Sequence, residues 1–153
     1  DRNEMVETAP IAYVNNVSNI AKNDNFISVN NALTVDLTGQ ICSETLGYNM
    51  YSGTGGQVDF VRGARFSNGG KSFIALNSTA KTKNGLVSRI TASLDPGTIV
   101  TTPRTDVQYL VTEYGIVNIF NKSISERARL MIEIAHPDFR QELESQAKDA
   151  GLL

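Results

Sequence analysis

In the C-terminal third of the chain, apolar side chains recur every three or four positions, which is the spacing of one face of an α-helix. Ser123-Ile124-Ser125-Glu126 opens this region with a capping-box pattern, in which a hydroxyl and a carboxylate satisfy free N–H groups at a helix start. Pro137 suits the first position of a second helix, and Gly151 would end it. The apolar stripes are Ile124, Ala128, Met131 and Ala135, and then Phe139, Leu143, Ala147 and Ala150. The pattern therefore predicts two consecutive helices at this end of the sequence.

Upstream, the apolar runs are short, rich in β-branched residues and separated by Gly and Pro, which is typical of strands. One helical turn is predicted within residues 17–23 and a short helix at 58–64. The alternation predicts an α/β fold or a β-rich sheet. Strands are predicted at residues 12–14, 26–37 (one long strand or a pair), 41–46, 72–76, 86–92, 98–101 and 107–112.

Length and composition narrow the class of protein without identifying a function. The 153 residues fit one domain with a real core, and 41% hydrophobic and 20% charged residues are ordinary for a globular protein. A net charge of −2 argues against a basic nucleic-acid surface or a polybasic membrane patch. No apolar run approaches the roughly 18 residues of a membrane helix. Cys42 is the single cysteine, so no internal disulfide forms, and a reducing, cytoplasmic location is expected.

The first ten residues differ from the rest. Residues 1–10 carry four charges and end at Pro10, and we interpret them as a linker or strap from a preceding domain, with residues 11–153 as one domain. The sequence begins at Asp1 rather than Met, which suggests a fragment of a longer polypeptide, although tag removal or processing would give the same start.

Ser52-Gly53-Thr54-Gly55-Gly56-Gln57 is the most glycine-dense stretch of the chain. Glycines let backbone N–H groups approach a ligand closely, and such groups can hold an oxyanion or a phosphate. The stretch lacks the Gly-Lys-Ser/Thr of a phosphate-binding P-loop and the spacing of a dinucleotide fingerprint. A plain tight turn and a ligand-binding loop both stay open on this pattern.

Two charged residues are further candidates. Glu113 follows the apolar run 109–112, and α/β proteins place site residues at the carboxyl ends of strands, although a solvated strand end fits as well. Lys81 lies in a small, polar, basic stretch that either meets a phosphate or carboxylate or is an exposed loop. His136, the only histidine, precedes Pro137 at a helix boundary, which favours a structural role over catalysis.

Several segments, in one order along the chain, resemble the C-terminal domain of the acetyl-CoA hydrolase/transferase family. The glycine stretch and the residues after it, Ser52 to Ala64, match the family's glycine loop almost residue for residue. The Gln57 form of this loop is closer to butyrate and 4-hydroxybutyrate CoA-transferases than to the acetate/succinate branch. The matching segments are residues 14–16, 23–30, 35–40, 52–64, 78–81, 111–116 and 135–140.

The resemblance implies a CoA-transferase fold, with two related α/β domains in one polypeptide and an open sheet with flanking helices in this part. It implies a ping-pong reaction in which a glutamate attacks an acyl-CoA thioester and then carries CoA as a glutamyl-CoA thioester. The nucleophilic glutamate lies upstream in the family and has no counterpart here. This chain alone is therefore expected to be inactive.

The resemblance also implies roles for individual residues. Asn15 matches a side-chain amide near the oxyanion, and Gly56 matches the backbone N–H donor, with Asn16 and Gly55 as the adjacent alternatives. Glu113 matches an auxiliary site residue. Gly55, Gln57 and Lys81 match positions near the substrate and CoA.

The expected partners are an acyl-CoA, a short-chain carboxylate such as 4-hydroxybutyrate, butyrate or acetate, and the N-terminal domain of the same polypeptide, with a homodimer implied by resemblance. CoA is expected as a substrate, with no other cofactor and no metal, nucleic acid or membrane. A CoA-thioester hydrolase on the same scaffold and a non-catalytic acyl-CoA-binding module are the alternatives.

Overall fold

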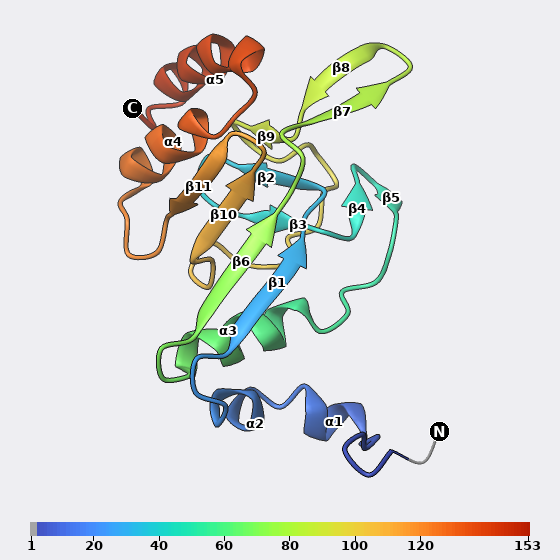
Figure 1. Cartoon of the computed structure of the whole chain (residues 1–153). Coiled ribbons are helices and arrows are strands. Elements are labelled where there is room, and N and C mark those ends of the chain that lie inside the picture. Colours follow the sequence, from blue (N-terminus) through green and yellow to red (C-terminus); the bar gives the residue numbers. More distant parts are fainter. Residues whose placement is uncertain (1–2) are drawn as a thin grey trace.

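Parallel strands form the centre of the main sheet. A computed structural model, which describes residues 3–153, places β1 (Ile27–Asn31), β6 (Lys71–Ala75) and β10 (Tyr109–Thr112) side by side and parallel (Figure 1). β11 (Gly115–Asn118) pairs antiparallel with β10, which gives the order β1-β6-β10-β11. The expected open sheet with flanking helices is confirmed.

Smaller pieces of sheet lie behind and beside the main one. β2 pairs with β3 antiparallel and with β9 parallel, in the order β3-β2-β9. Two hairpins, β4-β5 and β7-β8, project from the body (Figure 1). The bounds are β2 (Thr34–Asp36), β3 (Ile41–Cys42), β4 (Thr45–Leu46), β5 (Asn49–Met50), β7 (Thr79–Thr82), β8 (Gly85–Ser88) and β9 (Ile90–Thr91).

One face of the main sheet packs on helices to form the core. Ile74 of β6 and Leu110 of β10 belong to the same buried cluster as Val61 of α3 (Gln57–Phe66) and Met131 of α4 (Ile124–Glu133). Burying such side chains contributes about 25 cal/mol per Å² of apolar surface removed from water, so this face holds the layers together.

The two C-terminal helices confirm the helical pattern in the sequence. At the start of α4, Ser123 Oγ accepts a hydrogen bond from the Glu126 N–H, and the Glu126 carboxylate accepts one from the Ser123 N–H at 2.8 Å. α5 (Pro137–Asp149) begins at Pro137 and is followed by Gly151 at φ +68°. α4 and α5 stack together at one end of the main sheet (Figure 1).

The strand predicted at residues 12–14 is wrong. Residues Ile11–Val14 form the short helix α1, which leads into α2 (Val17–Ala21) in the region where one helical turn was predicted. The carbonyl of Pro10 accepts hydrogen bonds from the Tyr13 and Val14 N–H groups. Because the apolar side chains of α1 are not buried by any neighbouring strand in the described chain, local hydrogen bonding decides its conformation.

The strand predicted at residues 98–101 is also wrong, because this segment runs as a loop. The Ile99 N–H donates to the side-chain hydroxyl of Thr45 rather than to a backbone carbonyl of a neighbouring strand. Only Thr102, just beyond, forms an isolated β-bridge with Ile41.

Three segments predicted as strands, one of them as a single strand or a pair, are each divided between two sheets. Residues 26–37 form β1 and β2, which lie in different sheets and do not pair with each other. Residues 41–46 form β3 and β4, and residues 86–92 form β8 and β9, with Arg89 between them. The apolar pattern located these segments, but not the bends that pass the chain from one sheet to the next.

Candidate functional site

The carboxyl ends of the parallel strands open into a pocket of about 440 Å³. Since β1, β6 and β10 run in the same direction, the residues that follow them meet at one edge of the sheet. The lining includes Asn31 from β1, Ala75 at the end of β6 and Asn77 after it, Val111 from β10 and Glu113 after it, and Arg89 between β8 and β9. The pocket thus combines an apolar floor with charges of both signs.

Glu113 lies at this edge, as predicted from its place after an apolar run. Ser78 donates two hydrogen bonds to its carboxylate, one from the hydroxyl at 2.7 Å and one from the backbone N–H at 2.9 Å. Burial alone would raise the pKa of Glu113. The hydrogen bonds from Ser78 and from the Glu113 backbone, together with the charge of His136, lower it, and the net pKa lies below its ordinary value. The carboxylate is therefore ionised and held in one orientation at neutral pH.

Replacing Ser78 with Ala removes one of these donors, so we expect the pKa of Glu113 to rise toward its ordinary value. A lowered folded-state pKa stabilises the fold above the unfolded-state pKa, and this contribution is lost as the pH falls through the folded-state value. Less of that stabilisation should therefore remain in Ser78→Ala. An NMR titration of the side-chain carboxyl measures the shift. Glu126, whose pKa is lowered by its own contacts with Ser123, should titrate unchanged in the same spectra. An unaltered Glu113 midpoint would contradict the role of the Ser78 hydroxyl.

The glycine stretch ends at the N-terminus of α3, where Gly56 is the N-cap residue. No side chain caps this helix, so the N–H groups of its first turn have no side-chain partner in the described chain. Gly55 has φ +55°, a conformation that favours glycine, whereas Gly56 has φ −100°. The glycines therefore turn the chain so that free backbone donors stand at a helix start, where partial positive charge gathers.

Asn15 lies directly against this helix start. A Cβ added to Gly56 would overlap the Asn15 amide nitrogen, which shows how closely the side chain packs on the loop. The same amide nitrogen donates to the Asp59 carboxylate at 3.4 Å. The tertiary structure thus brings Asn15 and Gly56 together, as the predicted oxyanion role requires.

Asn16 is engaged elsewhere. Its side-chain oxygen accepts hydrogen bonds from the Ser18 N–H at 2.9 Å and the Asn19 N–H at 3.3 Å, so it caps α2. Of the two adjacent asparagines, only Asn15 has its side chain on the glycine stretch.

Gln57 links the glycine stretch to the carboxyl-edge pocket. Its side chain is buried, donates to the Asn31 carbonyl at 2.9 Å, and accepts from the hydroxyls of Ser43 and Thr102, both at 3.0 Å. These bonds occupy the side-chain amide, so a substrate contact by Gln57 would come from its main chain. Because Asn31 also lines the pocket that Glu113 lines, Gln57 connects the two parts of the site.

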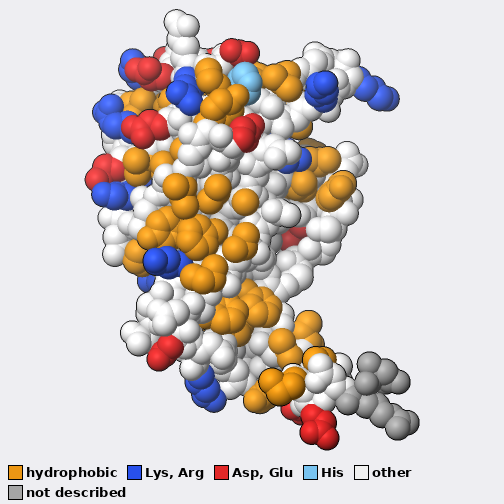
Figure 2. Space-filling view, in the orientation of Figure 1, with side chains coloured by type: hydrophobic (Ala, Val, Ile, Leu, Met, Phe, Trp, Pro, Cys, Tyr) orange, Lys and Arg blue, Asp and Glu red, His pale blue; other side chains and the backbone are white. Residues whose placement is uncertain are grey.

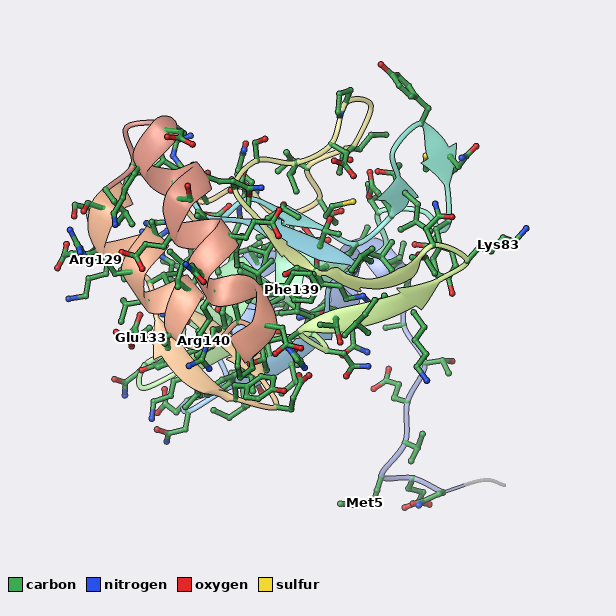
Figure 3. All side chains as sticks on the ribbon, turned by 90° about the horizontal axis from the view of Figure 1, so that it is seen from above. Met5, Lys83, Arg129, Glu133, Phe139 and Arg140 are labelled. Atoms are coloured by element: carbon green, nitrogen blue, oxygen red, sulfur yellow. The ribbon has the colours of Figure 1, made fainter. Side chains whose placement is uncertain are left out.

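Lys81 stands apart from the other candidates. It lies on β7, in the exposed β7-β8 hairpin, where it pairs with Leu86 across the turn. Lys83, at the tip of the same hairpin, points away from the rest of the molecule (Figure 3). Within residues 3–153, no hydrogen bond joins Lys81 to Asn15, Gly56 or Glu113, so its predicted role stays a prediction.

Sequence reasoning did not single out Ser78, which binds the Glu113 carboxylate, or two polar residues that line the pocket, Asn77 and Arg89. Asn77 and Ser78 follow the buried strand β6, so the strand-end rule that selected Glu113 would also have found them. Arg89 carried no such signal, because the pattern placed it inside a continuous strand at residues 86–92.

Two structural features concern metals and membranes. In the described part of the chain, no three His, Cys, Asp or Glu side chains gather closely enough to hold a metal ion. None of the helices in residues 3–153 has the length and apolar character needed to cross a membrane.

Comparison with known proteins extends this picture. Residues 1–147 match the family described as "Acetyl-CoA hydrolase/transferase C-terminal domain". The chain is 53% identical over 148 residues to a 4-hydroxybutyrate coenzyme A transferase of Clostridium kluyveri, covering 97% of this chain and 34% of that protein. It is also 53% identical over 148 residues to a succinyl-CoA:cyclohexane-1-carboxylate CoA transferase of Geobacter metallireducens, covering 97% and 33%. Among solved structures, RipA from Yersinia pestis superposes with a TM-score of 0.82 and 49% identity over 94% of this chain and 30% of that one. The chain therefore spans about a third of the length of these relatives.

Proposed function

The chain belongs to the acetyl-CoA hydrolase/transferase family, whose C-terminal domain it matches over residues 1–147, and we propose that it is the C-terminal part of a CoA-transferase. In this proposal the polypeptide moves CoA between a short-chain acyl-CoA and a carboxylic acid, with 4-hydroxybutyrate, butyrate or acetate as the acids. Two relatives of equal identity are named for different acids, so the acid pair depends on more than the features they share.

The proposed reaction uses a glutamate in an N-terminal part of the polypeptide. Its carboxylate attacks the thioester carbon, an acyl-glutamyl anhydride forms, and CoA thiolate leaves. The thiolate then attacks the glutamyl carbon of the anhydride, which gives the glutamyl-CoA thioester and releases the first acid. A second carboxylate reverses these steps and leaves as its acyl-CoA. Each attack passes through a tetrahedral oxyanion, which needs preorganised donors.

The placement of the Asn15 amide against Gly56, at the start of α3, carries the proposal. A side-chain amide and uncapped helix N–H groups in one place are donors suited to a developing oxyanion. Glu113, ionised and oriented by Ser78, serves in this proposal as an auxiliary group beside the reacting carboxylates. Gly55, the main chain of Gln57, and Lys81 face the substrate and CoA once the N-terminal part closes the site.

The remaining assignments belong to the same proposal. Residues 1–10 are the strap from the preceding domain, residues 11–153 are the C-terminal domain, and the assembled protein is a homodimer. CoA enters as a substrate and no further cofactor takes part. The location is cytoplasmic, in keeping with Cys42 being a free, buried thiol.

Intact mass spectrometry of the full-length polypeptide tests the proposal. After addition of acetyl-CoA, we expect a native mass well above 16.6 kDa that gains one CoA less one water, the mass of a glutamyl-CoA thioester. Adding a second carboxylic acid should remove the adduct and yield the new acyl-CoA. Release of free acid and CoA without an acceptor would indicate a hydrolase instead. Acyl-CoA binding with neither adduct nor turnover would leave a binding module.

A further inference from the structure

One face of the main sheet carries apolar side chains that nothing covers in residues 3–153. On this face, Val29, Phe73 and Tyr109 stand in register across β1, β6 and β10, and Val111 pairs with Ile116. Val29 is 67% exposed and Ile116 is 55% exposed, although both lie on strands of the central sheet. Figure 2 shows hydrophobic side chains gathered over this sheet in the middle of the view. We call Ile27, Val29, Phe73, Tyr109, Val111 and Ile116 the open sheet face.

The open sheet face is flat, apolar and nearly uncharged, as is typical of a surface that another layer of structure covers. The rings of Phe73 and Tyr109 stack at a centroid distance of 4.9 Å, which makes a flat apolar centre. Among the described residues, Lys71 is the single charged side chain that these strands place on this face. It lies opposite Ile27, at the start of β6. Sheets of parallel strands are normally covered by helices on both faces, and here α3 and α4 cover only the other one. A large exposed apolar patch of this kind marks a contact surface.

The length of the relatives indicates what covers it. The chain matches a C-terminal domain and spans only 34% of the Clostridium kluyveri protein, so such proteins have a long stretch of chain before this part. The chain reaches the sheet through α1 and α2 and enters at β1, the edge strand, whose outer side has no strand partner within residues 3–153. Met5, on the segment leading to α1, lies well away from the body of the molecule (Figure 3). The described chain therefore enters the main sheet at its β1 edge.

We propose that the open sheet face is the docking surface for a helical layer from the N-terminal part of the same polypeptide. This proposal rests on the proposed function in one respect, namely that this chain is the C-terminal part of a longer protein. An amphipathic helix with an aliphatic stripe is the occupant that suits a flat, nearly uncharged sheet of parallel strands.

Thiol labelling of the full-length polypeptide tests this assignment. Val29→Cys places a reactive group on the edge strand β1, and Ile116→Cys places one on β11 at the opposite edge of the sheet. Ser145→Cys, on the exposed side of α5, is the matched control, and the native Cys42 is fully buried. Each rate with a maleimide is compared with that of the same variant unfolded in urea. We expect the two sheet positions to react about 100-fold more slowly when native, because labelling then needs local opening of the docked layer. Ser145→Cys should react at nearly its unfolded rate.

Two outcomes would overturn the proposal. Native rates at Val29→Cys and Ile116→Cys as fast as in urea would show that the face is bare. Protection that disappears when the protein is diluted to a monomer would assign the face to a second copy of the chain. The acyl-CoA adduct is measured on the same samples, so the two proposals fail separately. Protection without an adduct refutes the proposed function alone, and an adduct without protection refutes the docking alone.

Discussion

Replacing Asn15 with Ala in the full-length polypeptide is expected to lower turnover by about 100- to 1,000-fold, the cost of removing one oxyanion donor. The side chain is half-buried, and its amide nitrogen makes one long hydrogen bond, at 3.4 Å to Asp59. Losing that bond should change the free energy of unfolding by about 1 kcal/mol or less. Turnover measured with saturating acyl-CoA and acceptor acid, together with urea unfolding, separates the two effects.

Asn16→Ala is the matched control, because Asn16 has a structural role at the start of α2. Its side chain caps α2, so its removal should cost about 1 kcal/mol of stability and leave turnover close to that of the parent protein. Near-normal turnover in Asn15→Ala would show that Asn15 is not an oxyanion donor. A large loss of turnover in Asn16→Ala would instead assign the oxyanion role to Asn16.

Gly56→Val is expected to abolish measurable turnover while the fold survives. A φ of −100° is allowed for any residue, so the substitution does not force a side chain into the left-handed region of backbone conformation. The new side chain would instead displace the Asn15 amide and press on the Phe60 ring, which a Cβ alone approaches to 3.4 Å. It would also fill the space in front of the first N–H groups of α3. Circular dichroism and size-exclusion chromatography check the fold, and steady-state kinetics measure the loss.

Gly53→Val provides the control within the same loop. No atom lies within 4 Å of a Cβ built at Gly53, and its φ is not in the positive region, so this variant should keep its activity. Retained turnover in Gly56→Val would contradict the assignment and point to Gly55 or to a purely structural loop. Equal losses in both variants would show that the loop tolerates no side chain, whatever the position of Asn15.

The helices at the C-terminus were predictable because their signals are local. Ser123 and Glu126 satisfy each other's N–H groups within one turn, and Pro137 and Gly151 act through their own backbone preferences. The apolar run before Glu113 also predicted its position at a strand end, although that pattern alone left a solvated strand end open. The same rule applied to β6 would have added Asn77 and Ser78.

The errors occurred where partners from elsewhere in the chain decide the conformation. Residues 12–14 have a pattern that suits a strand, but no strand lies beside them in the described structure, and the Pro10 carbonyl starts a helix instead. Residues 98–101 are all β-branched, yet the Ile99 N–H donates to the Thr45 hydroxyl. A strand requires a neighbour, and sequence spacing does not reveal which neighbours are available.

By itself, the sequence determined the family resemblance, the glycine stretch and the residue types of the site, because each is a property of consecutive positions. Only the tertiary structure decided that Asn15, rather than Asn16, packs against Gly56. It also decided that the hydrogen bonds of the Gln57 side chain go to other residues of the protein, and that Ser78 orients the Glu113 carboxylate. The same holds for the open sheet face, whose side chains come from four strands spread between residues 27 and 118. These contacts join distant segments, and their geometry depends on strand register and helix packing, which no local pattern encodes.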